Sequence, residues 1–310
     1  MIVIWTTAAD TSSDRVVSAL EREGATYLRL DIDAQAADEN GVEWNSQAGG
    51  ALVSGGHRCK ASDVSAIYYR RPYVSEVTDD ARDFATHEAL YFTRCVLLRA
   101  TSARWMSHPS RVLEAENKLW QLSVAEASGM SVPRTLVSSD PRQALDFYLL
   151  CDRDVVCKPG FAGFVRSPTP RAVYTWRLGE DLTQMDLESV RAAPTLLQER
   201  VEKVADIRVT HVGGEAIAVR IRSPPGTLDW RQEIDGDLAY ELAAVPSGVA
   251  RGMSEVLRRL GLTYGAFDFA ETPDGSWVFL EVNPVGQWEW LQVETGADIA
   301  GAIAGWLVQG

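Results

Sequence analysis

The chain has 310 residues, of which 43 are acidic and 30 basic, so its formal net charge is −13. This negative balance argues against a nucleic-acid partner, because phosphate backbones attract a basic protein face. No apolar run reaches the roughly 18 residues that a membrane-spanning helix needs, so no membrane partner is expected. The length allows two or three domains with a substantial core.

The cysteine and histidine pattern argues against a zinc site. The four cysteines show no CxxC spacing, and the four histidines form no HExxH motif. We interpret the cysteines as reduced, mostly buried thiols of a cytosolic protein. Residues 1–5 lack the basic region and the long apolar run of a secretory signal. Together these features predict a cytoplasmic location.

The first third of the sequence predicts an α/β unit. Residues 2–6 form an apolar strand pattern, and a polar segment at 10–14 begins a helix that Gly24 ends. With a strand at 25–32 this is a βαβ opening, but it has no GxGxxG motif and therefore no dinucleotide fingerprint. The elements expected after it are a strand at 64–69, which ends in Arg70-Arg71-Pro72, and a helix at 79–100.

The middle of the sequence predicts a second unit of mixed helices and strands. The expected elements are a helix at 113–128, a short strand into which residues 132–135 lead, a helix at 141–150, and strands at 154–159 and 196–201. Lys158 comes near the end of a strand and before a loop that contains Gly160 and Gly163. A lysine at a strand end beside free backbone amides suits phosphate binding, although a solvated lysine would fit the same pattern.

The last third predicts two hairpins and two helices. Gly213-Gly214 separate strand patterns at 206–212 and 215–222, which is typical of a tight β-hairpin. A helix at 246–260 precedes Gly261, and a final packing helix is expected at 298–308.

The second hairpin gathers three oxygen-bearing side chains. Asp268 lies almost as far before the turn at 272–276 as Glu281 lies after it, so strand pairing brings them together. Strand alternation places Asn283 on the same face as Glu281. Two carboxylates and an amide suit a hard cation such as Mg²⁺. A strand face open to water would carry the same residues, but the apolar neighbours of Glu281 make an unpaired charge costly if that strand end is buried.

Two further segments are candidates for binding a nucleotide. Lys118 precedes a helix and supplies either a second cation or a plain surface charge. The segment Gln198-Glu199-Arg200-Val201 ends a buried-looking strand, where exposed backbone would bind an adenine edge, or simply link two domains.

Four arginines of the last third are candidate partners for phosphate. With a two-residue turn, strand alternation places Arg208 on one sheet face and Arg220 with Arg222 on the other. Only one set would then face a nucleotide, unless a bulge intervenes. Arg231 lies further along the same region. Several of these arginines would also fit a role in balancing the surface charge.

The motifs that the sequence lacks narrow the chemistry. No Walker A motif is present, and neither a GxSxG motif nor a Ser/His/Asp set suggests a covalent nucleophile. A metal site combined with cations and positioning groups is typical of phosphoryl transfer.

The order of these segments resembles the ATP-grasp superfamily. The matching segments are Asn117-Lys118, Val156-Cys157-Lys158-Pro159, Gln198-Glu199, Asp206-Ile207-Arg208-Val209, 265–269 and Glu281-Val282-Asn283-Pro284. Within it, the chain is most similar to the graspetide (microviridin-type) maturases of ribosomal peptides, and the similarity covers almost the whole chain. The segments that carry this closer likeness are 68–72, 172–175, Asp229-Trp230-Arg231, 283–288 and 294–296.

The resemblance implies an α/β (α+β) ATP-grasp fold with three domains, at 1–112, 113–195 and 196–310. It implies an enzyme that phosphorylates Asp or Glu side chains of a precursor peptide and closes rings onto Ser/Thr hydroxyls or Lys amines. Its cofactors would be ATP and Mg²⁺, with two ions expected. A leader segment of the precursor peptide would bind away from the reaction centre, and the protein is expected to be a homodimer.

The resemblance also assigns roles to particular residues. Lys118 and Lys158 would hold ATP phosphates, the segment 198–201 would bind adenine, and Asp268, Glu281 and Asn283 would bind Mg²⁺. Arg208 and Arg231 would face the acyl phosphate, and the candidates for peptide binding are Arg70, Arg71, Arg166 and Arg220. The loop after Lys158 has fewer small residues than a phosphate lid usually has, which leaves the role of Arg166 open.

Two alternatives use the same residues. One is another ATP-grasp carboxylate–amine ligase, which adds free amino acids to a protein tail or makes small peptides. The other is a non-catalytic nucleotide-binding scaffold, which the complete set of metal ligands and both lysines disfavour.

Overall fold

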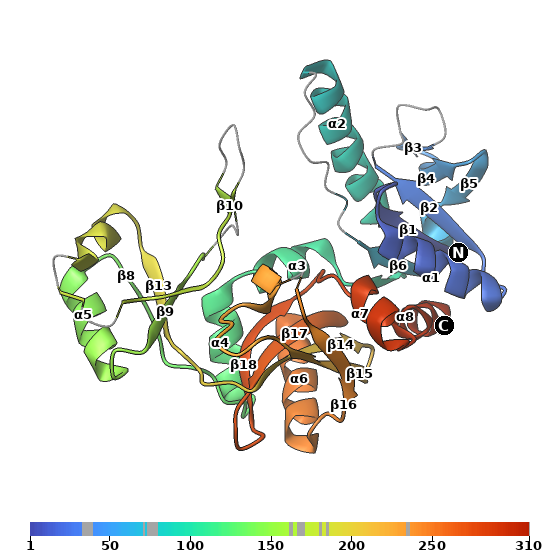
Figure 1. Ribbon diagram of the computed structural model, residues 1–310. Helices are drawn as coiled ribbons and strands as arrows, with labels where there is room; N and C mark the ends of the chain where they lie inside the picture. Colours follow the sequence, from blue (N-terminus) through green and yellow to red (C-terminus); the bar gives the residue numbers. More distant parts are fainter. Residues whose placement is uncertain are drawn as a thin grey trace.

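The computed structural model arranges the chain in three parts, with a C-terminal sheet between an N-terminal unit and a central unit (Figure 1). The residues that it describes are 1–32, 40–70, 72, 80–160, 164–165, 171–179, 182–183, 186–233 and 236–309. Within these ranges, no helix combines the length and the apolar character needed to cross a membrane.

The N-terminal unit is built on a parallel sheet in the order β2-β1-β6-β7, and β1, α1 and β2 form the predicted βαβ opening. Its strands are β1 (Ile2–Thr6), β2 (Tyr27–Asp31), β6 (Ala66–Tyr69) and β7 (Arg104–Met106). Helix α1 (Thr11–Arg22) joins β1 to β2 and buries Val16, Ala19 and Leu20, while α2 (Asp80–Leu97) projects from the unit (Figure 1).

A second, antiparallel sheet of the N-terminal unit was not predicted. It contains β3 (Asn40–Asn45), β4 (Gly49–Ser54) and β5 (His57–Lys60). These strands are short and rich in glycine and polar residues, so they lack the alternation that marks a half-buried strand.

The helix predicted at 113–128 is wrong in one respect, because two helices occupy this region. They are α3 (Pro109–Ala115) and α4 (Lys118–Ala127). Asn117 caps α4, since its side chain accepts a hydrogen bond of 3.1 Å from the Trp120 amide. The cap interrupts the helix and places Lys118 in the first turn of α4.

The central unit is an antiparallel sheet in the order β12-β9-β13-β8, with α5 (Pro141–Leu150) and a 3₁₀ helix (Asp186–Ala192) packed against it. Its strands are β8 (Thr135–Ser138), β9 (Val155–Lys158), β12 (Trp176–Arg177) and β13 (Thr195–Glu199). The hairpin of β10 (Phe164–Val165) and β11 (Arg171–Ala172) extends away from this sheet (Figure 1). Because β13 pairs with both β8 and β9, we propose that the central unit extends to Glu199.

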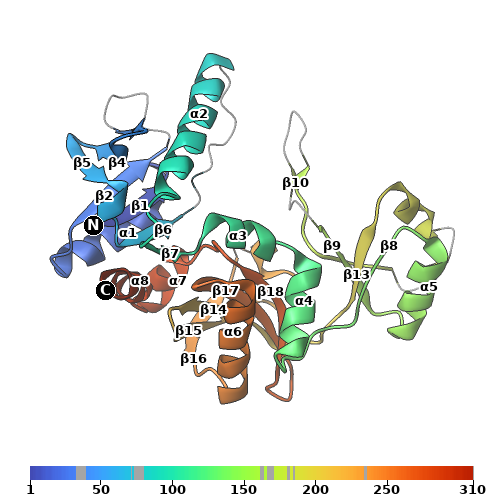
Figure 2. The same ribbon diagram turned by 180° about the vertical axis from the view of Figure 1, so that it is seen from behind.

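The C-terminal sheet is antiparallel, in the order β16-β15-β14-β17-β18. Its strands are β14 (Ala205–Val212), β15 (Glu215–Arg222), β16 (Ala239–Ala243), β17 (Tyr264–Glu271) and β18 (Trp277–Asn283). Gly213 and Gly214 form the turn between β14 and β15, as predicted. Helices α6 (Ser247–Leu260) and α4 lie beside each other against this sheet (Figure 2).

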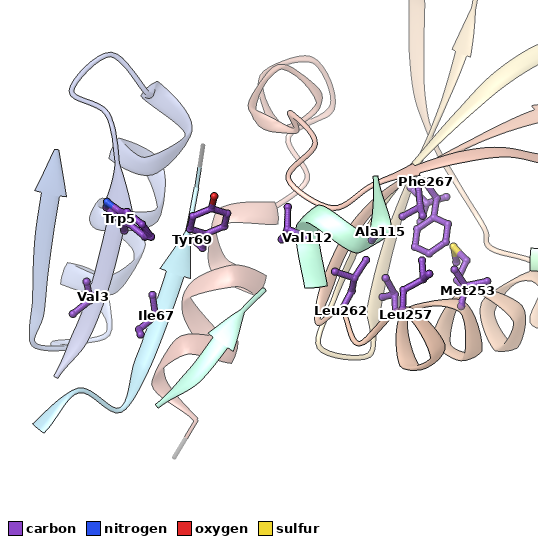
Figure 3. Close-up of a cluster of buried hydrophobic side chains, with 14 of the residues drawn as sticks. Val3, Trp5, Ile67, Tyr69, Val112, Ala115, Met253, Leu257, Leu262 and Phe267 are labelled. Atoms are coloured by element: carbon purple, nitrogen blue, oxygen red, sulfur yellow. The ribbon is translucent and has the colours of Figure 1, made fainter. Parts of the chain in front are cut away.

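The last two helices return to the N-terminal unit. They are α7 (Glu289–Thr295) and α8 (Ile299–Val308), and α8 packs against α1. One apolar cluster also runs from Trp5 and Tyr69 through Val112 to Leu257 and Phe267 (Figure 3). The N-terminal unit is therefore joined to the C-terminal sheet by buried side chains.

Candidate functional site

A cavity of about 470 Å³ lies between the central sheet and the C-terminal sheet. Strands β9 and β13 supply one side of its lining, and β14, β17 and β18 supply the other. The predicted residues that line it are Lys118, Lys158, Gln198, Glu199, Arg200, Val201, Arg208, Arg231, Asp268, Glu281 and Asn283. The structure thus brings together residues that are far apart in the sequence, since Lys118 and Asn283 are separated by 165 positions (283 − 118).

The acidic centre of the cavity is formed by the hairpin of β17 and β18. Asp268 pairs directly with Glu281, and a β-bulge follows immediately, so that Leu280 is the extra residue of β18. Asn283 Nδ2 donates to Asp268 Oδ2 and to Glu281 Oε1, both at 3.4 Å. The three side chains therefore lie together in the structure, as the hairpin pattern predicts.

Two cations lie beside these carboxylates. Lys118 forms an ion pair with Glu281, and Nη1 of Arg208 donates to both carboxylate oxygens of Asp268 at 2.7 and 2.6 Å. Burial acts to raise the pKa of Glu281, but the charge of Lys118 and its hydrogen bond lower that pKa to about 2. Burial raises the pKa of Asp268, although Arg208 opposes the rise. Glu281 is therefore the more strongly ionised of the two.

The donor set of this centre fits a hard divalent cation. Two carboxylates and one amide oxygen are the oxygen ligands that Mg²⁺ accepts, with water and phosphate completing its shell. Lys118 and Arg208 supply the positive charge that compensates these two adjacent, half-buried carboxylates. Asp268, Glu281 and Asn283 are thus the residues that could hold Mg²⁺.

Lys158 faces the same centre from the end of β9. Its ammonium group donates to Gln198 Oε1 at 2.6 Å, and Gln198 Nε2 donates in turn to Thr135 Oγ1 at 2.9 Å. Burial lowers the pKa of Lys158 to about 8, although Glu281 opposes this change. Arg166, a predicted peptide-binding residue in the loop after Lys158, lies outside the described residues.

The strand end at Glu199 leaves one backbone donor available. The amides of Glu199 and Arg200 donate to the carbonyls of Arg134 and Asp154, both at 2.9 Å. In the part of the chain that the structure describes, the Val201 amide has no such partner. The side chains of Glu199 and Arg200 pair with Arg134 and Asp154, which fixes the segment against the central sheet.

The arginines divide between two faces, as the strand alternation predicts. Arg231 lies at the cavity, where Nε and Nη2 donate to the carboxylate of Asp229, both at 2.8 Å. This pairing raises the pKa of Arg231. Arg220 points to the opposite sheet face, where it binds Glu271 and Glu241, each at 2.6 Å. Arg220 does not line the cavity, and its contact with the peptide remains a prediction.

Arg70 is also placed differently from the prediction. Its side chain is 1% exposed and points into the protein, where it donates to Val285 O and Gln287 Oε1, and to Gly286 O at 3.3 Å. A buried guanidinium with these partners is not available to seat a peptide, which corrects our expectation. Arg71 lies outside the described residues.

Several cavity residues were not predicted. Lys203 lines the cavity and its ammonium group donates to Asp206 at 2.6 Å. Gln287 is a further lining residue. Trp230 and Trp290 also line the cavity, with ring centroids 5.0 Å apart and ring planes tilted by 37°. The segments around Trp230 and Gln287 carried the family likeness, so a signal existed for both. Lys203 lies in the connection between β13 and β14, where the sequence offered no signal for a cavity residue.

Comparison with known proteins identifies the class. No family model matches the chain. Among curated proteins, the alpha-aminoadipate–LysW ligase LysX of Sulfurisphaera tokodaii is 25% identical over 194 residues. The match covers 61% of this chain and 66% of that relative, just under two thirds of its length.

Solved structures match over nearly the whole chain. Macrocyclase MdnB of Microcystis aeruginosa MRC is 30% identical with a TM-score of 0.79, covering 100% of this chain and 99% of that one. Macrocyclase MdnC from the same organism, bound with precursor peptide MdnA, is 27% identical with a TM-score of 0.82, covering 99% of both chains. A third structure is the RiPP-associated ATP-grasp ligase of Chryseobacterium gregarium in complex with ADP and a leader and core peptide. It is 24% identical to this chain and has a TM-score of 0.85. It covers 99% of this chain and 96% of that one.

The chain belongs to the ATP-grasp ligases, in the family of these macrocyclases. The α/β fold expected from the sequence is confirmed.

Proposed function

We propose that the protein is an ATP-dependent peptide macrocyclase. It phosphorylates an Asp or Glu side chain of a ribosomal precursor peptide and closes a ring onto a Ser/Thr hydroxyl or a Lys amine of that peptide. The observation that carries the proposal is the convergence of Asp268, Glu281 and Asn283 with Lys118 and Lys158 in one cavity. The macrocyclases MdnB and MdnC, which match over nearly the full length, support the peptide substrate.

Nucleotide binding uses groups from both sides of the cavity. Lys158 and Lys118 bind phosphate oxygens, and the free amide of Val201 donates to the adenine edge. Asp268, Glu281 and Asn283 would hold Mg²⁺, as two ions in our proposal, and the bound cation would neutralise charge on the phosphates. Once its ammonium turns to phosphate, Lys118 leaves Glu281 free for the cation.

Two transfers then follow at the same place. A carboxylate oxygen of the peptide attacks the γ-phosphorus of ATP, the bond to the β–γ bridging oxygen breaks, and ADP leaves. The acceptor oxygen or nitrogen then attacks the carbonyl carbon of the acyl phosphate, and the bond from that carbon to the phosphate oxygen breaks. Phosphate leaves with the bonding electrons and takes up the proton that the acceptor loses. Arg208 and Arg231 lie where they can stabilise negative charge on the transferred group.

The remaining partners are part of the same proposal. Arg71 and Arg166 stay as candidates for peptide contacts, whereas Arg70 does not. We also propose that the protein acts in the cytoplasm as a homodimer.

The match to LysX favours a second candidate function, because the name of that ligase contains two separate partners, alpha-aminoadipate and LysW. In that case the same cavity would join a free amino acid to a carboxylate. The two functions are separated by supplying ATP and Mg²⁺ with either the precursor peptide encoded beside the gene or a mixture of amino acids. Macrocyclisation requires ADP release with the peptide alone and a fall in peptide mass. Consumption of an amino acid together with a rise in mass supports the second function.

A further inference from the structure

The loop directly after Asn283 is held by the N-terminal unit. Arg70 directly follows strand β6 of the first sheet. Its guanidinium donates to three successive residues of this loop, which are Val285, Gly286 and Gln287. Arg70 is 1% exposed, so water cannot replace these acceptors. A buried guanidinium without acceptors is strongly destabilised, so the loop and Arg70 must fit each other.

The start of α1 completes this support. Ser12 Oγ donates to Gln287 Oε1 at 3.1 Å. Asp10 Oδ2 lies 3.6 Å from Arg70 Nε and accepts hydrogen bonds from Thr6 at 2.9 Å and Ser13 at 2.6 Å. The carboxylate that faces Arg70 is thus itself fixed within the N-terminal unit.

The same loop also contacts Arg208 and Tyr264 of the C-terminal sheet. The carbonyl of Gln287 accepts from Arg208 Nη2 at 3.1 Å, and Arg208 in turn binds Asp268. Tyr264 donates its hydroxyl hydrogen to Gly286 O at 2.8 Å. Gln287 therefore joins two buried arginines, one through its side chain and one through its backbone.

We propose that Arg70 is a positioning residue that sets the orientation of Arg208 and Asp268 through Gln287. Arg70 does not line the cavity, and it acts through the loop at 285–287. The kinetic part of this inference rests on the proposed function, whereas its structural part does not. Because misorientation of a reacting group slows the chemical step more than it weakens binding, kcat is the quantity that Arg70 controls.

The test uses two variants that break the connection and one that restores it. Arg70→Lys keeps the charge but cannot reach three acceptors with a planar fork. Gln287→Met removes the side-chain acceptor, and Gln287→Glu supplies it again. The matched control is Arg15→Gln, because Arg15 joins the same two units through Glu289 at 2.7 Å without touching the loop.

We expect Arg70→Lys and Gln287→Met to lower kcat for ring formation by about tenfold or more, with KM for ATP and for peptide changed by less than about threefold. Gln287→Glu recovers most of the rate lost in Gln287→Met, and Arg15→Gln leaves kcat unchanged. Amide hydrogen exchange without substrate should accelerate at 284–288 and 264–271 in Arg70→Lys, but not in Arg15→Gln.

Equal effects of Arg70→Lys and Arg15→Gln on kcat and on exchange would overturn the inference. So would a loss of kcat that follows thermal stability alone and that Gln287→Glu does not reverse. If Arg70→Lys does not fold, Gln287→Met and Gln287→Glu decide the question. If the wild-type protein forms no ring but the exchange pattern appears, the proposed function fails and the positioning role stands.

Discussion

Asp268 and Glu281 lie directly opposite each other on β17 and β18. Like charges in this arrangement destabilise a sheet, and here each is held by its own cation, Arg208 or Lys118. A hairpin optimised only for stability would place apolar or oppositely charged residues at this pair. The arrangement is better explained by a bound cation and phosphate than by the needs of the fold.

Glu281→Gln should abolish ATP turnover and leave the fold nearly intact. The ion pair that it breaks is partly exposed, with 34% of the Lys118 side chain accessible, so we expect a stability change within about 1 kcal/mol. Thermal unfolding and ADP release measure the two effects. Glu241→Gln is the control, since this carboxylate pairs with Arg220 on the other face. Unfolding of Glu281→Gln at ordinary temperature would make Glu281 a structural residue instead.

ATP should bind more weakly as the pH rises above about 8. Burial lowers the pKa of Lys158 to about 8, so above this pH the free protein has a neutral lysine, while phosphate binding requires the ammonium form. Binding at pH 9 should therefore take up a proton, and affinity should fall by up to about tenfold per pH unit.

Calorimetry in two buffers of different ionisation enthalpy measures this uptake. Lys158→Arg, which stays charged, should bind ATP without it. Equal proton uptake by the variant and the wild-type protein would assign the effect to another group.

The strand patterns predicted much of the site because alternation is a local property. It placed Glu281 beside Asn283, and it separated Arg208 from Arg220, without knowledge of the fold. The position of Arg70 could not be obtained in this way. Its partner Val285 is 215 positions away, and nothing in the segment around Arg70 indicates burial rather than exposure.

The missed features have similar causes. The break between α3 and α4 depends on one side-chain cap at Asn117, which apolar periodicity does not detect. The domain boundary expected after residue 195 places β13 in the last unit, whereas its hydrogen bonds are with β8 and β9. Lys203 reaches the cavity from a connection that has no periodic pattern.

Arg208→Lys should lower kcat by about a hundredfold or more, because one ammonium cannot replace the guanidinium contacts to Asp268 and Gln287. Arg220→Lys is a matched control, since it also breaks an arginine–carboxylate pair of the same sheet, with Glu271. The control should lose stability but keep kcat. Equal kcat losses in the two variants would remove Arg208 from the reacting site.

Gly286→Ala should impair both stability and turnover. A Cβ at this position would overlap with Ala266 Cβ and lie 3.0 Å from Arg208 Nη2, so either the loop or the arginine must move. We expect a loss of about 1–3 kcal/mol in unfolding free energy and a reduced kcat. Gly248→Ala, in α6 with open space around its Cβ position, should be neutral or stabilising. Full activity of Gly286→Ala would show that the loop tolerates displacement.

The intact mass of the precursor peptide after reaction tests the central claim most directly. The peptide encoded beside the gene is incubated with ATP, Mg²⁺ and either the wild-type protein or Asp268→Ala. The account predicts the loss of one water mass and the formation of one ADP for each ring, with no change for Asp268→Ala. An unchanged peptide mass while ADP still forms, or a mass that rises by an added amino acid, would contradict it.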